Sequence, residues 1–367
     1  MTMNGRKGLA AAALTLCAGL CAFDPAFAAG ATPPSTQTPP STQMNAGVIP
    51  PAPMPAVRRP PPQAVNPAAA AEATAARLKR INAVTNWGYQ LASLSIDAAA
   101  NAPYGLLVVD ATSGLDTGKP FTREQVEHLK LASDGSRRIV ISYLSIGESE
   151  DYRADYFSPE YMEEEAPDWL MKENPQWKGN RLIRFCEEGW QKTILGDENG
   201  RNVYSGDAPS PLYKLLELGF DGVYLDRVDV YSEIAKECPD GANKMVSFVA
   251  RLAEHARKKD PNFLVILQNA EELLANPKMV ATIDGVAKES LFFGADMSQR
   301  KNPQAVVDAT LANLNRAKSA GRAVFVVDYV TDRTRAAEAA SRIAAVGFIP
   351  YVGPRNLANL WLPGINF

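Results

Sequence analysis

Eight short apolar runs, rich in β-branched residues, recur between residue 80 and the C-terminus, and amphipathic helical stretches separate several of them. Alternating strands and helices predict a parallel sheet. Eight repeats favour closure into a (β/α)8 TIM barrel, an α/β fold, over an open doubly wound sheet. The predicted strands are Tyr89–Ser93, Leu106–Asp110, Ile139–Ser145, Val223–Asp226, Phe263–Gln268, Asp284–Glu289, Ala323–Asp328 and Gly347–Val352.

The N-terminal residues differ in composition from the rest of the chain. Arg6 and Lys7 precede an apolar run, and Ala26-Phe27-Ala28 forms a small-x-small site, so residues 1–28 are predicted to be a cleaved signal peptide. Residues 29–75 are rich in Pro and Ala, most strongly up to about residue 67, and are predicted to be a disordered linker that ends in a short helix. We expect one barrel domain over residues 76–367, in a periplasmic or secreted protein.

Charge and cysteine content further narrow the class of protein that this chain can be. A net charge of −3 with no basic patch argues against a nucleic-acid binder. The apolar run of the leader is too short to span a membrane, and no later run is long enough. We therefore expect no membrane span, and a monomer. Outside the leader, Cys186 and Cys238 either pair in an oxidising compartment or remain two buried free thiols.

Residues 151–208 interrupt the alternation of strands and helices. Only Leu182–Phe185 looks like a clean strand there, and the segment contains Trp169, Trp177 and Trp190. Long loops on a barrel are typical of its ligand-binding face, so we expect this excursion to lie beside a site.

Polar side chains end most of the predicted strands. One Asp after one strand is more often a turn residue or a helix cap, but such residues end six of the eight. The C-terminal strand ends of a parallel barrel share one rim, where barrel active sites lie, so these side chains should converge. They are Asp110, Glu148 (after Ser145), Asp226 with Asp229, Gln268 with Asn269, Glu289, and Asp328 with Tyr329.

Missing residues and motifs narrow the chemistry. The only histidines, His128 and His255, fall in helical stretches, which argues against a Ser-His-Asp triad and a His-rich zinc site. There is no GxxxxGK[ST] loop, no GxGxxG after the first strand and no calcium-binding loop. We therefore expect no cofactor and no metal. A carboxylate pair remains, in which one group protonates a leaving oxygen and the other acts as a nucleophile or activates water.

Aromatic residues near the strand ends agree with a sugar ligand, because flat rings offer sugars an apolar face. Taken singly, each is more typical of a core position. An acidic rim would also attract a cationic sugar. The aromatic residues in question are Tyr143, Tyr152, Trp169, Trp190, Tyr224, Tyr329 and Tyr351.

Five segments together resemble glycoside hydrolase family 114, the endo-α-1,4-polygalactosaminidase-like family. They are "SYLSIGESEDYR" (142–153), "GFDGVYLDRVDVY" (219–231), "NFLVILQNAEELL" (262–274), "IDGVAKESLFFG" (283–294) and "FVVDYV" (325–330). The resemblance spans about Trp87 to Arg355. It implies a (β/α)8 barrel that cleaves exopolysaccharide containing α-1,4-linked galactosamine or N-acetylgalactosamine.

The resemblance also implies roles for particular residues. The catalytic carboxylates of the family match Asp226 and Glu289. Other motif positions, expected to bind substrate, match Glu148, Asp229, Gln268 and Asn269, and we add Asp110, Tyr143, Tyr224, Asp328 and Tyr329 from the strand ends. Two departures bear on substrate detail: Ala270 replaces an expected glycine, and Cys186 stands where a tryptophan is common.

The roles within the pair remain a hypothesis. We expect Asp226 to be the nucleophile and Glu289 the acid/base, because the longer side chain reaches the glycosidic oxygen more easily. The rival hypothesis is a non-catalytic polysaccharide-binding or export-associated barrel, since a barrel can keep its cleft without its chemistry.

Overall fold

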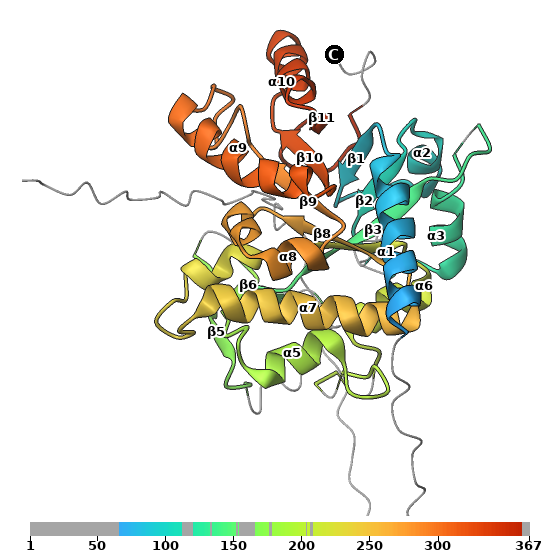
Figure 1. The fold of residues 1–367 in the computed structure, drawn as a ribbon, viewed down its shortest axis with the longest axis vertical. Helices are drawn as coiled ribbons and strands as arrows, with labels where there is room; N and C mark the ends of the chain where they lie inside the picture. The colour runs from blue at the N-terminus through green and yellow to red at the C-terminus, as the bar shows by residue number, and fades with distance from the viewer. Residues whose placement is uncertain are drawn as a thin grey trace, which may run out of the picture.

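Eight parallel strands form one sheet in the order β1-β2-β3-β7-β8-β9-β10-β11, with helices packed outside it (Figure 1). The computed structural model describes residues 66–111, 120–132, 134–151, 153, 166–175, 178–202, 204–205 and 208–361. The strands are β1 (Trp87–Gln90), β2 (Leu106–Val109), β3 (Ile139–Ser145), β7 (Gly222–Asp226), β8 (Leu264–Gln268), β9 (Gly285–Glu289), β10 (Ala323–Asp328) and β11 (Ile349–Val352).

The sheet curves into a nearly closed barrel. At the seam between its first and last strands, the indole Nε1 of Trp87 in β1 donates to the carbonyl oxygen of Ile349 in β11, at 3.0 Å. The backbone N–H groups of Leu91 and Ala92 donate to the carbonyl of Leu357 just beyond β11. The predicted (β/α)8 barrel is confirmed.

The helices lie between the strands, as the alternating pattern predicts. Those of the described residues are α1 (Pro67–Asn82), α2 (Ile96–Asn101), α3 (Arg123–Leu129), α5 (Glu188–Leu195), α6 (Pro211–Leu218), α7 (Gly241–Lys259), α8 (Pro277–Thr282), α9 (Gln304–Ser319) and α10 (Arg333–Ala345), with 3₁₀ turns η1 (Val228–Ser232) and η2 (Glu271–Ala275). The amphipathic stretches that separate predicted strands in the sequence include α3, α7, α9 and α10. Helix α1 crosses the expected boundary at residue 75, and that boundary stays a prediction.

Strand boundaries were less accurate than strand identities. The first predicted strand was placed two residues late, because β1 begins at Trp87 and ends at Gln90. The last was begun two residues early, since Gly347 instead ends the preceding turn with φ 71°. Glycine permits this left-handed backbone without a Cβ clash.

The barrel interior is filled mainly by aromatic rings. The ring centroids of Tyr89 and Tyr224 are 5.2 Å apart, and those of Trp87 and Phe325 are 5.4 Å apart. A glycine on a neighbouring strand leaves room for one of them: a Cβ at Gly285 would lie 3.4 Å from Cε2 of Phe325. Each aromatic side chain buries a large apolar area, so aromatic residues contribute strongly to the stability of a core.

Helix α1 is fastened to the N-terminal side of the barrel by buried charges. Asp284, just before β9, is 1% exposed and accepts from Arg77 of α1 at 3.0 Å and from Arg257 of α7 at 2.7 Å. Arg77 also donates to the carbonyl of Pro261. Because these contacts lie where strands begin, α1 leaves the opposite rim uncovered.

The excursion after β3 contains a second, smaller sheet. Its strands are β4 (Glu148–Glu150), β6 (Asn180–Ile183) and β5 (Leu170–Glu173), in that order and antiparallel. Only β6 was predicted, two residues late. The strands β4 and β5 contain Glu, Lys and Ser, and give no apolar alternation by which sequence could find them.

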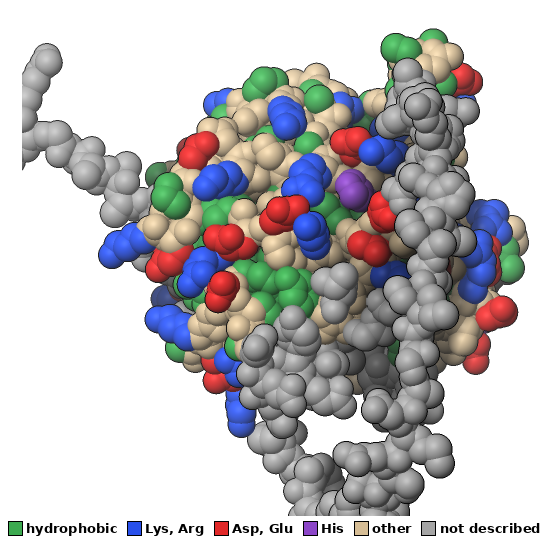
Figure 2. All heavy atoms as spheres, turned by 90° about the horizontal axis from the view of Figure 1, so that it is seen from below, with side chains coloured by type: hydrophobic (Ala, Val, Ile, Leu, Met, Phe, Trp, Pro, Cys, Tyr) green, Lys and Arg blue, Asp and Glu red, His purple; other side chains and the backbone are tan. Residues whose placement is uncertain are grey.

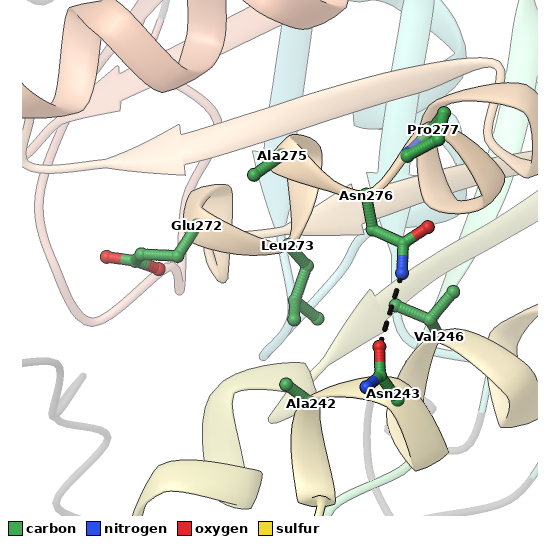
Figure 3. Close-up of a pocket in the computed structure, with 8 residues that line it drawn as sticks. All are labelled: Ala242, Asn243, Val246, Glu272, Leu273, Ala275, Asn276 and Pro277. Carbon is green, nitrogen blue, oxygen red and sulfur yellow. Dashed lines mark hydrogen bonds between the residues drawn. The ribbon is translucent and has the colours of Figure 1, made fainter.

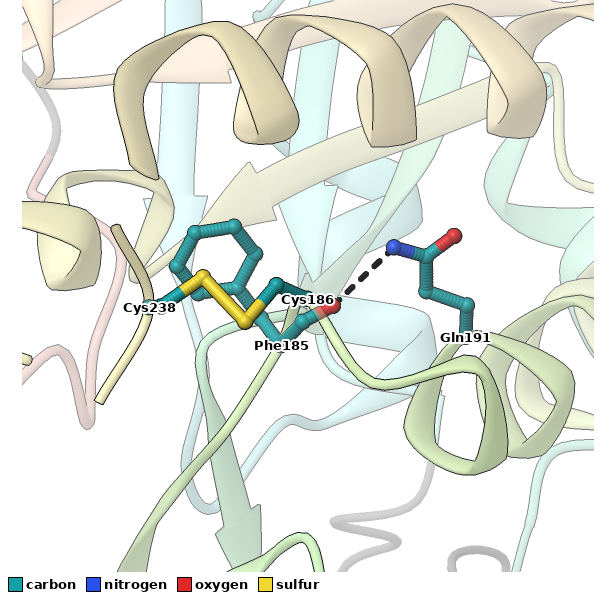
Figure 4. The surroundings of a disulfide bond; sticks show 4 residues. All are labelled: Phe185, Cys186, Gln191 and Cys238. Carbon is teal, nitrogen blue, oxygen red and sulfur yellow. Dashed lines mark hydrogen bonds between the residues drawn. A yellow bond between two sulfur atoms is a disulfide. The ribbon is translucent and has the colours of Figure 1, made fainter. Parts of the chain in front are cut away.

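A disulfide joins the excursion to the chain that follows β7. Cys186, beyond β6, pairs with Cys238, before α7, with 6.2 Å between their Cα atoms (Figure 4). Beside it, Gln191 of α5 donates to the carbonyl oxygen of Phe185 at 3.1 Å. The pairing that the sequence left open is therefore a disulfide between two segments 52 residues apart.

Removing this disulfide should destabilise the protein. In protein lacking residues 1–28, thiol titration after denaturation without reductant should find no free thiol. Replacing both Cys186 and Cys238 by Ser should lower the free energy of unfolding by about 4 kcal/mol, because the unfolded chain regains the entropy of a closed loop. Chemical denaturation with and without reductant measures this, and the double variant, as the control, should show no effect of reductant. Two free thiols in the unreduced protein would contradict the pairing.

Candidate active site

Two carboxylates stand at the same rim of the barrel, separated by one strand. Asp226 is the last residue of β7 and Glu289 the last of β9, with β8 between them. In both strands the preceding residues are buried and only this last one is partly accessible. The polar strand ends thus open onto one face of the barrel, as the parallel topology requires.

Asp226 is held by a phenol on the neighbouring strand. The hydroxyl of Tyr143 in β3 donates to its Oδ2 at 2.7 Å. Burial, and then the negative charge of Glu289, raise the pKa of Asp226 to about 7, against the opposing effects of Tyr143 and Arg227. Low water access and a neighbouring negative charge thus both favour the protonated form of Asp226.

Glu289 receives hydrogen bonds from both sides. The hydroxyl of Tyr329 donates to its Oε1, and Nδ2 of Asn269 donates to its Oε2 at 3.0 Å. Asn269 in turn accepts from the backbone N–H of Glu289 at 3.1 Å, so its amide is fixed in orientation. Asn269 has a left-handed backbone, φ 54°, which turns the chain sharply after β8.

The cations next to the pair in sequence are paired with other acids. Nζ of Lys288 lies 3.0 Å from a carboxylate oxygen of Glu271. Arg227, with φ 57°, reaches Glu148 at 2.9 Å and Glu233 at 2.8 Å. Both cations therefore bind acids other than Asp226 and Glu289, although the charge of Arg227 still acts to lower the pKa of Asp226.

Glu148 and Asp110 form the wall of the site. The carboxylate of Glu148 is 1% exposed and accepts from Asn174 at 2.7 Å and Asn180 at 3.0 Å, in addition to Arg227. It therefore fastens the small sheet to the turn after β7. Asp110 binds Arg153 through both of its oxygens.

Arg153 connects that wall to the pair. Its guanidinium lies 5.6 Å from the ring centroid of Tyr143, whose hydroxyl donates to Asp226. The carboxylates of Asp110 and Glu148 are thus engaged by protein groups, and each supports a neighbour of the pair.

Asp328 is also engaged by the protein. It is fully buried, and the backbone N–H of Phe292 donates to both of its oxygens at 3.2 Å, so it holds the chain that leaves β9. Burial raises the pKa of Asp328 to about 7. The side chain is covered in this structure, and the substrate contact expected from Asp328 stays a prediction.

Three further predicted residues lie at different depths. Asp229 in η1 is 14% exposed, and its nearest cation, Arg227, is 3.7 Å away. Burial raises the pKa of Asp229. Gln268 is buried and accepts from the hydroxyl of Tyr89 at 3.4 Å. Tyr224 lies fully buried in the barrel interior, one layer below Asp226.

The aromatic residues of the excursion pack inward. Trp169 and Trp190 are 3% and 0% exposed, with ring centroids 5.1 Å apart, so they form the core of the excursion and offer no face to a sugar. Tyr351 is buried against Trp87. Tyr152 and Trp177 lie outside the described residues.

Sequence reasoning missed Arg355, which follows β11. Its guanidinium lies 4.3 Å from the ring centroid of Tyr329 and donates to Ser290 at 3.2 Å and to the carbonyl of Gly294 at 2.8 Å. It braces Tyr329 and the turn after Glu289. An arginine in a Pro-rich turn gives no local signal for this role.

A groove of about 390 Å³ lies outside the rim, between η2 and the start of α7 (Figure 3). Nδ2 of Asn276 approaches Oδ1 of Asn243 across it, at 3.4 Å. Neither member of the carboxylate pair lines it. The lining residues are Ala242, Asn243, Val246, Glu272, Leu273, Ala275, Asn276 and Pro277.

Three features bear on binding partners: the surface charge, groups that could hold a metal ion and helices that could span a membrane. On the face drawn in Figure 2, Lys and Arg side chains are interspersed with Asp and Glu. Among the described residues, no group of three or more His, Cys, Asp or Glu is placed to hold a metal ion. In the same part of the chain, no helix combines the length and the apolar character of a membrane span.

Comparison with known proteins agrees with this geometry. The model of glycoside-hydrolase family GH114 matches residues 66–363. The chain belongs to this family. The match covers the whole barrel and includes α1.

Two relatives are identical to this chain at about a third of the aligned positions. An uncharacterised protein of Methanocaldococcus jannaschii is 34% identical over 300 residues, 76% of this chain and 80% of the relative. One of Deinococcus radiodurans is 33% identical over 285 residues, 77% and 84% of the two chains. The solved glycoside hydrolase domain of PelA from Pseudomonas aeruginosa is 19% identical, with a TM-score of 0.56 over 75% of this chain and 97% of that domain, and shows the same fold.

Proposed function

We propose that this glycoside hydrolase is secreted or periplasmic and cleaves exopolysaccharide containing α-1,4-linked galactosamine or N-acetylgalactosamine, with Asp226 and Glu289 as its catalytic pair. The observation that carries the proposal is the coupling of these carboxyls at one rim, where burial and the charge of Glu289 raise the pKa of Asp226 to about 7. Glycoside hydrolysis needs one protonated and one ionised carboxyl at the same pH.

Other groups at the rim support the same chemistry. The hydroxyls of Tyr143 and Tyr329, and Nδ2 of Asn269, fix the orientation of the two carboxyls. Accurate placement of the reacting groups lowers the entropic part of the barrier. Asp229, partly exposed and only loosely paired with Arg227, offers a negative charge for an amino group of the substrate.

The pair shares one proton between two arrangements. In the free protein, Glu289 accepts hydrogen bonds from Tyr329 and Asn269, and the raised pKa of Asp226 favours the proton on Asp226. The productive arrangement has the proton on Glu289. There the charge of Glu289 no longer raises the pKa of Asp226, and an ionised Asp226 attacks the anomeric carbon while Glu289 protonates the leaving oxygen. This keeps Asp226 as nucleophile and Glu289 as acid/base, with retention of configuration.

Loss of either carboxyl should abolish turnover while the protein stays folded. Asp226→Asn and Glu289→Gln should each lower kcat roughly 10²–10⁴-fold. The melting temperature should hardly change, because each substitution removes a charge that repels its partner. Steady-state kinetics and thermal unfolding measure the two effects, and Asp97→Asn, in an exposed pair with His128, serves as the control. If activity merely followed the folded fraction, the pair would be structural.

The pH profile should be bell-shaped, with its basic limb near pH 7. Above the raised pKa of Asp226 the pair loses its shared proton, so no acid remains and activity falls. At low pH both carboxyls are protonated, so no nucleophile remains and activity falls again. A profile of kcat/KM from pH 4 to 9 tests this, and a plateau across that range would contradict a shared proton.

The two roles can be separated with azide and an activated glycoside substrate. Azide should restore activity to Asp226→Ala and give a glycosyl azide of inverted configuration, since azide takes the place of the nucleophile. With Glu289→Ala the azide adduct should keep the configuration of the substrate. Nuclear magnetic resonance of the products reads the configuration, and an inverted adduct from Glu289→Ala would exchange the two assignments.

Substrate class and activity can be tested together. Incubation with α-1,4-linked galactosamine oligomers should release shorter oligomers, detected by mass spectrometry. β-1,4-linked glucosamine oligomers, which carry the same charge but differ in the anomeric linkage and in the configuration at C4, should stay intact. Binding of the first oligomers without any cleavage would favour the rival function, a non-catalytic polysaccharide-binding or export-associated barrel.

A further inference from the structure

The hydroxyl of Tyr224 is buried in the barrel interior and has no hydrogen-bond partner among the described residues. The side chain is 0% exposed and packs against Tyr89 and Trp87. Most buried side-chain polar groups in folded proteins do have a partner, so each exception requires an explanation. A phenylalanine would fill the same space without burying an unpaired hydroxyl.

Tyr224 lies directly below the carboxylate pair. It precedes Asp226 by two positions in β7, so the two side chains point to the same face of the strand, into the barrel. Its backbone pairs with Tyr143 of β3 on one side and Ile266 of β8 on the other. The strand therefore sets Tyr224 on the same interior face as Asp226, and burial, followed by the charges of Glu289 and Asp226, raises the pKa of its hydroxyl.

The other groups that face this interior already have partners. Tyr143 donates to Asp226, Tyr329 donates to Glu289, and Tyr89 donates to Gln268. Tyr224 is therefore the one tyrosine of this set whose hydroxyl is not engaged among the described residues. The titratable side chains that surround it are Tyr89 of β1, Tyr143 of β3, Asp226 of β7, Glu289 of β9 and Tyr329 beyond β10.

We propose that Tyr224 is a positioning residue whose buried hydroxyl donates a hydrogen bond to the Asp226–Glu289 pair when the pair loses its last proton. In the first chemical step, negative charge leaves Asp226 as it bonds to the sugar and appears on Glu289 as it releases its proton. A donor on the same interior face stabilises that charge once its hydroxyl turns toward the pair. The kinetic part of this inference rests on the proposed function; the hydrogen bond itself does not.

The test removes the hydroxyl group of Tyr224 and leaves its ring in place. Tyr224→Phe should raise the pKa at which the pair loses its last proton by about one pH unit, because the ionised state loses a donor. Titration of the ¹³C-labelled carboxyl groups of Asp226 and Glu289 measures this without any substrate. At the pH optimum kcat should fall about tenfold with KM unchanged, because the same donor acts on the charge that develops.

A matched control is Tyr351→Phe. Tyr351 is also buried in the barrel, but its hydroxyl accepts from the backbone N–H of Trp361, at 3.1 Å. This variant should be less stable than wild type and keep the wild-type carboxyl titration. Tyr224→Phe should melt at the wild-type temperature or higher, since it removes an unpartnered buried hydroxyl.

The outcomes separate this proposal from the proposed function. An unchanged carboxyl titration in folded Tyr224→Phe, or an equal shift in Tyr351→Phe, would overturn the role of the hydroxyl. A shifted titration in a protein that hydrolyses no glycoside would support it and reject the catalytic function. If Tyr224→Phe did not fold, the ¹³Cζ resonance of Tyr224 in the wild type decides: it must move as the pair titrates, and a constant shift overturns the proposal.

Discussion

Burial of Asp226 at the same rim as Glu289 is the constraint on which this end of the barrel depends. Burial first, and then the negative charge of Glu289, disfavour the ionised form of Asp226 and raise its pKa to about 7. Such an arrangement is stable only when neutral donors satisfy the oxygens. Tyr143, Asn269 and Tyr329 provide them, from the ends of three other strands. Ion pairs with cations at these positions would have ionised both acids.

The cations next to the pair in sequence bind other acids. Arg227 binds Glu148 and Lys288 binds Glu271, so the negative charge of Glu289 still acts on Asp226. Glu148 meanwhile fastens the small sheet to the turn after β7, and the Cys186–Cys238 disulfide joins the same two regions. The excursion is therefore attached at two points to the segment between β7 and α7, and both attachments limit how far the excursion can move from the pair.

The sequence predicted the elements that depend on local pattern. Apolar runs and amphipathic stretches identified all eight barrel strands, and parallel topology then brought Asp226 and Glu289 to one rim. It could not predict contacts between distant segments. Nothing local shows that Asp110 binds Arg153, that Asp328 holds the backbone of Phe292, or that Cys186 meets Cys238. The strands β4 and β5 were missed because tertiary contacts, and no apolar alternation, stabilise them.

The acids at this rim fall into two groups. They differ in the hydrogen-bond partners of their carboxyl groups more than in their positions at strand ends. Asp110 and Glu148 are neutralised by arginines, and Asp328 is bonded to backbone N–H groups, so each holds a segment in place. Asp226 and Glu289 are bonded to phenols and an amide, which orient a carboxyl without fixing its charge. Only acids of the second kind can exchange a proton during a reaction. Tyr224 extends the same reasoning, because a hydroxyl without a partner next to such a pair can respond when the charge moves.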